Sequence, residues 1–374
     1  MDMKKKIGLI TIYHVPNYGS VLQTYATQVL LENLGMECHI INYKYPNEWH
    51  HSHGRPKSTI KSIIGHLFGL KSSHRKANKL KDFKKKHFNF TKLYKSLDEL
   101  KNTDWSGYDI FAVGSDQVWK AHFTLGDSVF LLSFIPDDKY RISIASSFAS
   151  KSIPDKYIEK YKKYLGKFNA ISVRENNGID IIEKDLQLKC IPEVILDPTL
   201  LLSKEEWLSV IPHSNFKKKK KYILLYMLTY AFEPRPYIFE VIKHLQSQEY
   251  YEVIALEGYT TKEQALGIEM IDKTDSSISE FIDLFANADI VVTSSFHGTA
   301  FAVNFGIPLI SIVPESNGDD RQSSLLKILG LNQCIATIET PTENILYDYD
   351  KETIEEILAQ LRKKSVQWIN EKLA

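Results

Sequence analysis

The chain has 374 residues, which is more than one ordinary domain needs and indicates two domains or one unusually large domain. Its 47 basic and 46 acidic side chains give a formal net charge of +1, and 43% of its residues are hydrophobic. This composition excludes wholesale disorder and a globally basic nucleic-acid-binding protein. Three scattered cysteines without C-x-x-C spacing predict neither a disulfide framework nor a bound metal, and they favour a reducing cytoplasm.

The amino terminus carries Lys4, Lys5 and Lys6 before an apolar run from Ile7 to Tyr13. This run is too short for a signal sequence and lacks a small-residue cleavage site. No apolar stretch in the sequence approaches the roughly 20 residues that a bilayer-spanning helix needs. We therefore expect a cytoplasmic protein whose first apolar run is a strand.

The first half of the chain alternates apolar runs with stretches of helical spacing. Ile7 to Tyr13 predicts a strand, Tyr18 to Leu34 a helix and Cys38 to Tyr43 a second strand. Further strands are predicted at Tyr108 to Val113, Arg141 to Ala145, Ala170 to Val173 and Cys190 to Leu196. Alternation of this kind predicts a parallel sheet with helices on both faces.

A second series follows the polar segment 211–221, which ends in five lysines. Strands are predicted at Tyr222 to Met227, Val253 to Leu256, Asp289 to Thr293 and Pro308 to Val313, with helices at Pro236 to Gln248 and Ser279 to Ala288. The fold class is therefore α/β, with two Rossmann-like domains facing a cleft in a GT-B-like arrangement. We place the domains at residues 1–200, with a basic insertion at 50–95, and at 201–350, followed by a helix at 351–374 that packs back on the first domain.

The segment from Arg55 to Lys95 is strongly basic, with Asp82 as its only acidic residue. Its first part places five apolar side chains at helical spacing: Ile60, Ile63, Ile64, Leu67 and Leu70. The favoured interpretation is a helix packed on the domain with a solvated lysine face. The alternative is a helix lying on the anionic inner face of the cytoplasmic membrane, held there by lysines such as Lys84, Lys85 and Lys86. Nucleic acid is not expected as a partner, because no recognition motif accompanies the charge.

The strongest local signal is the end of the predicted strand at 289–293, which runs into Ser294, Ser295 and His297 before a helix opening near Gly298 and Thr299. Ligands of open parallel sheets bind beyond the carboxyl ends of the strands, so these side chains are predicted at the cleft floor. The N–H groups of the helix would favour a phosphate or carboxylate. His297 would exchange a proton near neutral pH, or it would merely cap its helix.

The loop after the first strand occupies the equivalent position in the first domain. Gly19 permits close backbone approach, while Asn17, Tyr18, Ser20 and Gln23 offer groups suited to sugar hydroxyls. The loop lacks the G-x-G-x-x-G fingerprint, so a dinucleotide is not predicted here. The alternative is a plain strand-to-helix turn capped by Asn17 or Ser20.

Other strand ends carry further candidates. Asp116 would order a hydroxyl or act as a base, and Trp119 would either stack on a sugar face or lie in the core. Arg174 and Arg321 are candidate clamps for an anion, with an internal ion pair and a solvated surface side chain as their respective alternatives. Asp197 starts a turn and is interpreted as structural.

Taken together, five motifs resemble the polysaccharide pyruvyl transferase family in consistent order between residues 7 and 332. They are Asn17-Tyr18-Gly19-Ser20, Val113-Gly114-Ser115-Asp116-Gln117-Val118-Trp119, Ser172-Val173-Arg174-Glu175, Asp197-Pro198-Thr199-Leu200-Leu201 and Ser295-Phe296-His297-Gly298. The resemblance implies a GT-B-like enzyme that moves the enolpyruvyl group of phosphoenolpyruvate onto two sugar hydroxyls, forming a pyruvate ketal and releasing phosphate. It implies no metal and no cofactor beyond phosphoenolpyruvate as co-substrate.

The resemblance also assigns roles to residues of this chain. It makes His297 the general acid/base that protonates the vinyl carbon of the donor, with Asp116 ordering the acceptor hydroxyl. Donor binding is then expected from Arg174, Ser294, Ser295, Gly298, Thr299 and Arg321. Acceptor binding is expected from Asn17, Tyr18, Gly19, Ser20, Gln23 and Trp119. The acceptor would be a sugar of a capsular or other cell-envelope polysaccharide or its lipid-linked precursor.

One position departs from the family pattern. Many members carry an arginine two residues before the histidine, whereas this chain has Ser295, in a branch that reads Ser-Phe-His-Gly. A neutral serine does not replace that charge, so Arg174 and Arg321 compensate or the donor differs. A GT-B glycosyltransferase that uses a nucleotide sugar, and a non-catalytic glycan-binding protein, are the alternative functions.

Overall fold

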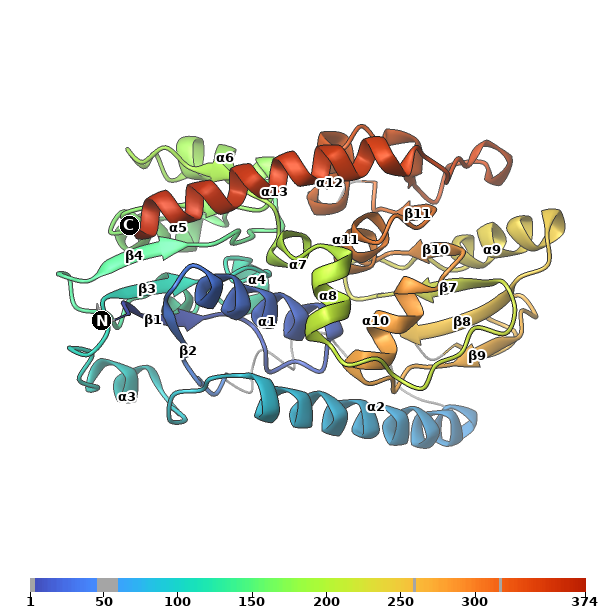
Figure 1. The fold of residues 1–374 in the computed structure, drawn as a ribbon, viewed down its shortest axis with the longest axis horizontal. Coiled ribbons are helices and arrows are strands. Elements are labelled where there is room, and N and C mark those ends of the chain that lie inside the picture. Colours follow the sequence, from blue (N-terminus) through green and yellow to red (C-terminus); the bar gives the residue numbers. More distant parts are fainter. Residues whose placement is uncertain (1–3, 46–59, 258–259, 316–317) are drawn as a thin grey trace.

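The computed structural model describes residues 4–45, 60–257, 260–315 and 318–374, with the side chains of 60–71 outside this description. The chain folds as two α/β halves placed side by side (Figure 1). Both sheets consist of parallel strands covered by helices, which confirms the predicted fold class.

The first sheet has the strand order β2-β1-β3-β4. Its strands are β1 (Lys6–Ile10), β2 (Glu37–Ile40), β3 (Ile110–Val113) and β4 (Tyr140–Ser143). A two-stranded sheet of β5 (Ser172–Val173) and β6 (Glu193–Val194) continues it through single bridges. The helices of this half are α1 (Tyr18–Asn33), α2 (Ile60–His87), α3 (Leu97–Lys101), α4 (Ala121–Thr124), α5 (Asp155–Leu165) and α6 (Asn176–Asp180).

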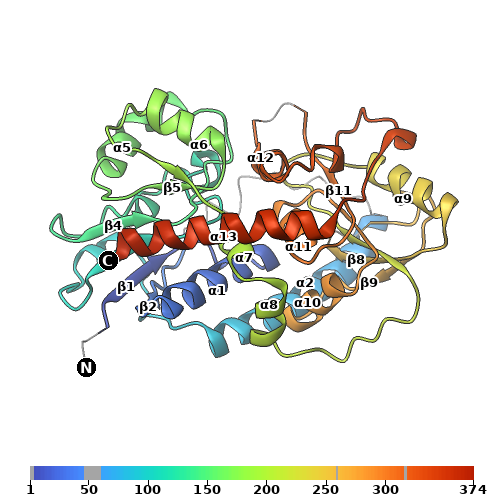
Figure 2. The ribbon, with the colours of Figure 1, turned by 45° about the horizontal axis from the view of Figure 1, so that its top comes forward.

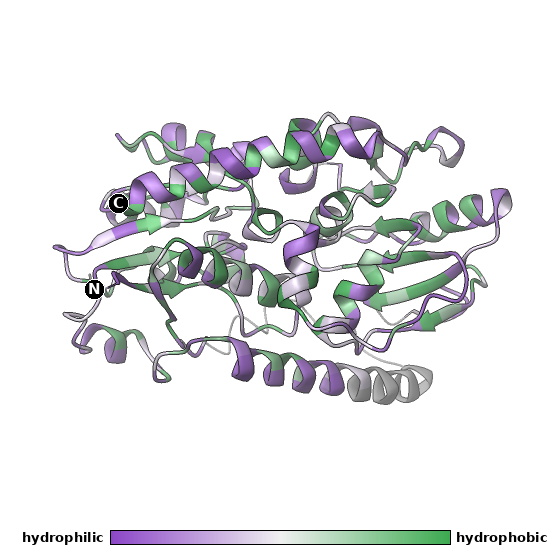
Figure 3. Cartoon of the chain, in the orientation of Figure 1, coloured by the Kyte–Doolittle hydropathy of each residue, from purple (hydrophilic) through white to green (hydrophobic). Residues whose placement is uncertain are grey.

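The second sheet has the strand order β12-β11-β10-β7-β8-β9. Its strands are β7 (Tyr222–Tyr226), β8 (Glu252–Glu257), β9 (Met270–Asp272), β10 (Ile290–Thr293), β11 (Leu309–Ile312) and β12 (Ile335–Ala336). The remaining helices are α7 (Pro198–Leu201), α8 (Lys204–Val210), α9 (Tyr237–Gln248), α10 (Ile278–Ala286), α11 (Phe296–Asn304), α12 (Arg321–Ile328) and α13 (Lys351–Leu373). The central strands β7 and β10 are buried on both faces and, in Figure 3, mostly hydrophobic.

The two halves share one hydrophobic core. A single cluster of buried side chains extends from Leu9 and Val21 in the first half to Leu224 and Phe281 in the second, and it includes Leu358 of α13. Helix α1 is buried along most of its length because it lies between its own sheet and α7. A shared core fixes how the two sheets face one another.

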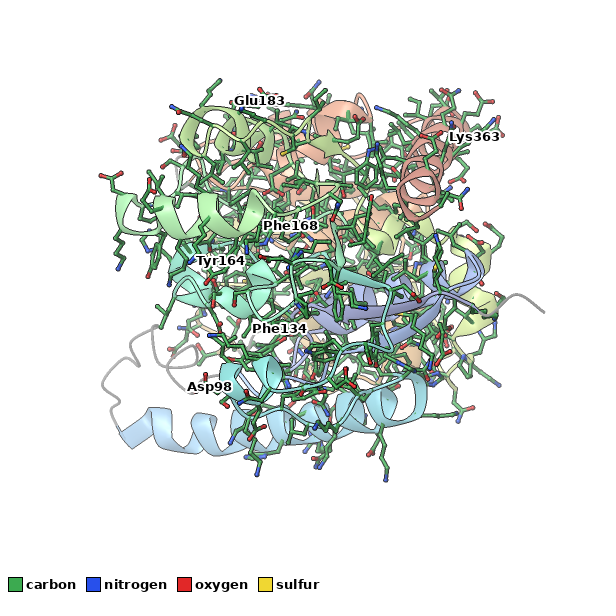
Figure 4. The ribbon with its side chains drawn as sticks, turned by 90° about the vertical axis from the view of Figure 1, so that its left-hand side faces the viewer. Asp98, Phe134, Tyr164, Phe168, Glu183 and Lys363 are labelled. Carbon is green, nitrogen blue, oxygen red and sulfur yellow. The ribbon has the colours of Figure 1, made fainter. Side chains whose placement is uncertain are left out.

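Helix α13 runs past both halves on one side of the molecule (Figures 1 and 2). Arg362 donates hydrogen bonds to the Leu200 carbonyl oxygen and to Asn304 Oδ1, each at 2.8 Å. Ser365 Oγ accepts from the Leu196 N–H at 3.1 Å. In the end-on view of Figure 4, Lys363 lies on the outer surface of this helix, whereas Phe134 and Phe168 lie within the first half.

Helix α2 runs along the opposite side and also spans both halves (Figure 1). Arg75, Lys76 and Lys79 form ion pairs with Asp275, Glu257 and Glu280 of the second half. The Lys76 ammonium lies 4.2 Å from the centre of the Tyr18 ring. Part of the basic segment is therefore a helix packed along both domains. Its predicted apolar stripe lies among the side chains outside the described residues. No described helix is long and apolar enough to span a membrane.

Candidate active site

A cavity of about 260 Å³ lies where the carboxyl ends of the two sheets meet. It is lined by residues following β1, β3, β7 and β10 and by one residue of α4: Ile12, Val15, Asn17, Ser20, Asp116, Gln117, Phe123, Leu228, Tyr230, Ser295, Phe296 and His297. Apolar and aromatic walls with a few polar groups are typical of a site for a small molecule. Among the described residues, no group of three or more His, Cys, Asp or Glu side chains is placed to hold a metal ion.

His297 lies between the two domains, in the first turn of α11. Gly19 makes room for its ring, because a Cβ atom on Gly19 would lie 2.0 Å from His297 Nδ1. The ring is 6% exposed, and its Nε2 atom is buried without a hydrogen-bond partner. Burial lowers the pKa of His297 to about 4, although Asp197 and Asp116 act in the opposite direction. The imidazole is therefore neutral at pH 7.

Asp197 and Arg174 form a buried ion pair next to His297. Arg174 Nη1 and Ser115 Oγ both donate to Asp197 Oδ2 at 2.7 Å, and that oxygen lies 4.0 Å from His297 Nε2. Burial opposes ionisation of Asp197, but Arg174, His297 and hydrogen bonds hold its pKa at about 2. The interpretation of Asp197 as merely structural missed this placement, because only the fold brings residues 174, 197 and 297 together.

Asp116 faces the same cavity from the first domain. It adopts a φ of 74°, a conformation uncommon for residues other than glycine. Its carboxylate accepts from Ser20 Oγ at 2.6 Å and from the Gln117 N–H at 2.8 Å. Such backbone conformations cluster at functional sites, where the surrounding structure holds a side chain in place. Asp116 and His297 thus line the same cavity from opposite domains.

Arg321 lies in the first turn of α12 and is 5% exposed. It binds Asp319 through two hydrogen bonds, from Nε at 2.7 Å and from Nη2 at 2.5 Å. With the amide oxygen of Gln117 turned toward it, that oxygen accepts from Nη1 at 2.9 Å and from Nη2 at 3.0 Å. Arg321 is therefore no solvated surface side chain, and Gln117 connects it to the cavity wall.

Three predicted acceptor-binding residues are buried and hydrogen-bonded inside the protein, and they do not line the cavity. Trp119 is fully buried, and its indole N–H donates to the Phe130 carbonyl oxygen at 3.0 Å, so the prediction that it stacks on a sugar is wrong. Among the described residues, the Gln23 amide donates to groups of its own domain, including Thr11 Oγ1 at 3.0 Å. Tyr18 donates across the domain boundary to the Ser276 carbonyl oxygen at 2.8 Å. Asn17 and Ser20 of the same loop do line the cavity.

Of the predicted donor-binding residues that follow β10, one lines the cavity and the others contact the surrounding protein. Ser295 lines the cavity and caps α11, where its Oγ accepts from the Gly298 N–H at 3.4 Å. Ser294 Oγ hydrogen-bonds to both backbone groups of Leu228 at 2.8 Å. Thr299 contacts Ser311, and a Cβ on Gly298 would lie 2.2 Å from Thr293 Oγ1. Ser294, Gly298 and Thr299 therefore support the site from behind in this structure.

The aromatic wall was not predicted from the sequence. Phe296 lines the cavity. The guanidinium carbon of Arg174 lies 4.2 Å from the centre of its ring, and that of Arg321 lies 5.9 Å from it. Phe123 and Tyr230 complete the wall. Tyr230 follows no recognisable motif, and it is 45% exposed beside the cavity. The sequence signal that could have predicted this wall is the presence of aromatic residues just after predicted strands.

Comparison with solved structures identifies the fold. A putative UDP-N-acetylglucosamine 2-epimerase from Listeria monocytogenes is similar with a TM-score of 0.54 and 12% identity, over 98% of this chain and 91% of that one. S. aureus MnaA, solved with UDP, has a TM-score of 0.52 and 12% identity, over 97% and 91%. Comparison with curated proteins gave no match. The two likenesses and the facing sheets define a protein of GT-B-like fold.

The family model of polysaccharide pyruvyl transferase matches residues 17–316. The chain belongs to this family of transferases, as the five motifs predicted. The matched residues include the loop at Asn17, the turn at Asp116, the Arg174–Asp197 pair and His297.

Proposed function

We propose that this protein transfers the enolpyruvyl group of phosphoenolpyruvate onto two hydroxyls of a sugar, forming a pyruvate ketal and releasing phosphate. The sugar belongs to a surface polysaccharide or to its lipid-linked precursor. The observation that carries the proposal is the cavity in which His297 and Asp116 face each other from opposite domains, in a member of this family.

The neutral state of His297 sets the order of proton transfers. An imidazole with a pKa of about 4 starts the reaction as a base, so it accepts a proton from the first attacking hydroxyl. It then delivers this proton to the methylene carbon of the donor, which becomes the methyl group. The hydroxyl oxygen bonds to the neighbouring carbon, and phosphate leaves. The second hydroxyl attacks the same carbon, with Asp116 ordering it and the released phosphate taking its proton.

The anionic donor meets cations that already have partners. Arg321 is shared between Asp319 and Gln117, and Arg174 is bound to Asp197. We propose that the donor phosphate displaces Gln117 from Arg321 Nη1 and Nη2, where it also meets N–H groups at the start of α11. Arg321 thereby supplies the charge that Ser295 lacks.

Turnover is tested by incubating the protein with phosphoenolpyruvate and a panel of sugars that includes lipid-linked acceptors. We expect phosphate release together with an acceptor that has gained a ketal carboxylate, identified by mass spectrometry. His297→Gln and Asp116→Asn are expected to abolish both products, while the matched variant of an exposed histidine, His122→Gln, retains them. Absence of product across the panel, combined with thermal stabilisation by nucleotide diphosphates alone, would identify a glycosyltransferase instead.

We also propose that the protein works at the inner face of the cytoplasmic membrane. The described part of α2 exposes Arg75, Lys81, Lys85 and Lys86. Lys84 was predicted to share this surface, but its ammonium turns inward and donates to the Tyr13 carbonyl oxygen at 3.1 Å. The proposed contact is between anionic lipid headgroups and these exposed cations, of which Arg75 also pairs with Asp275.

Liposome sedimentation tests this contact. We expect binding to anionic vesicles that weakens as salt rises and falls when Lys85 and Lys86 are changed to Gln. Changing Lys217 and Lys219 to Gln removes the same charge from another exposed site and is expected to have little effect. Equal binding to neutral vesicles would contradict the proposal.

A further inference from the structure

Asp197 is held in place by both of its carboxylate oxygens. Oδ1 accepts from the Thr199 N–H at 2.9 Å and from Thr199 Oγ1 at 2.6 Å, and Oδ2 accepts from Ser115 and Arg174. The carboxylate is 1% exposed. Four donors on one buried carboxylate leave it little freedom to rotate, so its position relative to His297 is fixed by the fold.

His297 presents an unused nitrogen to this carboxylate. Nε2 has no hydrogen-bond partner and lies 4.0 Å from Asp197 Oδ2, whereas Gly19 lies against the face of the ring beside Nδ1 and Cγ. The two residues come from different domains, because Asp197 precedes α7 and His297 belongs to α11. A buried polar nitrogen without a partner is rare and needs an explanation.

We propose that Asp197 is a positioning residue for His297, which holds the Nε2–H tautomer and receives that proton in a hydrogen bond when the ring becomes an imidazolium. This inference rests on the proposed function for the reaction in which the imidazolium forms. Nδ1 is then the atom that takes the hydroxyl proton and passes it to the donor carbon. Closing the 4.0 Å gap by about 1 Å gives an ordinary hydrogen-bond length.

The charges around the ring determine what happens when Asp197 loses its charge. Asp197 and Asp116 favour the imidazolium, whereas Arg174 and Arg321 disfavour it. In Asp197→Asn the nearest carboxylate is neutralised and Arg174 loses its counter-charge. The pKa of His297 must therefore fall further, and the acid limb of kcat/KM moves to lower pH.

The test is an NMR titration of histidine ring resonances in the whole protein, with His297 assigned by its loss in His297→Gln. We expect Asp197→Asn to lower the pKa of His297 and to reduce kcat about 10²- to 10⁴-fold, while the KM for phosphoenolpyruvate changes little. Asp98→Asn removes the charge of an exposed aspartate in α3, away from the cavity, so it is expected to leave both the titration and kcat near wild type.

Asp197→Asn leaves a buried arginine without its partner and can fail to fold. The double variant Asp197→Asn/Arg174→Met removes both charges and gives a second protein for the titration. There the pKa of His297 is expected to fall below the wild-type value, because Asp197 acts on it more strongly than Arg174 does. An unchanged titration in both variants would overturn the inference. Failure of the wild-type protein to use phosphoenolpyruvate would refute the proposed function instead and leave the titration result standing.

Discussion

Gly19→Ala is predicted to displace His297 without unfolding the protein. The new Cβ would lie 2.0, 2.3 and 2.7 Å from His297 Nδ1, Cγ and Cε1, well inside contact distance, so the ring must move by 1 Å or so. Gly19 lies in helix α1 with no positive φ, so alanine itself fits the backbone. The conflict is confined to the contact between two domains.

The expected magnitudes separate activity from stability. Alanine in a helix gains about 1 kcal/mol over glycine, while overpacking costs about 1–3 kcal/mol, so the net loss of unfolding free energy is about 0–2 kcal/mol. A displacement of about 1 Å in a reacting group costs about 10²-fold in rate. We therefore expect a small fall in Tm with a fall in kcat of about two orders of magnitude.

The assay measures kcat with phosphoenolpyruvate and the Tm of the same preparation. Gly107→Ala is the matched control, since a Cβ there has no atom within 4 Å. The double variant Gly19→Ala/His297→Ala is expected to regain the stability lost through the clash but no activity. Full activity of Gly19→Ala would show that the ring does not work from this position, and the reasoning would fail.

Three further predictions concern the buried charges. Because the pKa of His297 falls from 6.5 to about 4 on folding, the unfolded chain binds the proton first, and stability should decline by up to about 3 kcal/mol as the pH drops through that interval. In urea unfolding, the free energy of unfolding should depend less on pH in His297→Gln than in the wild type. In His122→Gln it should depend on pH as in the wild type. Glu175 Oε1 accepts three hydrogen bonds, so Glu175→Leu should lose about 3 kcal/mol or more in urea unfolding and Glu175→Gln much less. Lys76→Met should lower the Tm, because it leaves the Glu257 carboxylate unpaired. The double variant Lys76→Met/Glu257→Gln should regain part of the lost Tm. If the losses of the two single variants simply add in the double variant, the two side chains do not stabilise each other.

Hydrophobic periodicity was sufficient to predict the parallel sheets. Helix α13 spans Lys351–Leu373 and differs by one residue from the helix predicted at 351–374, and the strand predicted at Tyr222 to Met227 differs from β7 by one residue. The short strands β9 and β12 were missed, because two or three residues carry too little pattern to be recognised.

The rule that ligands bind beyond strand ends selected residues that line the cavity together with residues that do not. It selected Asp116 and Trp119 from the same turn, yet one side chain enters the cavity and the other enters the core. Asp116 has a positive φ of 74° in this turn, a conformation that residues other than glycine seldom adopt. No spacing of residue types reveals such a conformation before the fold is known.

Ion pairs between residues far apart in the sequence could not be predicted either. The basic residues of α2 were predicted as a solvated or membrane-facing surface, but Lys76 and Lys79 find their carboxylates about 200 positions later, in the second domain. Arg174 likewise pairs with Asp197, which follows it by 23 positions, beyond α6 and β6. Composition counts these charges without showing which of them neutralise one another.

The ion pairs of Arg174 and Arg321 affect how strongly the site can bind an anion. Arg321 is neutralised by Asp319 and Arg174 by Asp197, so the cavity presents no strong positive field in the absence of a donor. Phosphate binding at Arg321 must then exchange one set of hydrogen bonds for another, and its net gain is smaller than that of a free cation. In the proposed donor complex the phosphate charge would lie near His297 and favour the imidazolium, so donor binding would itself raise the basicity of His297.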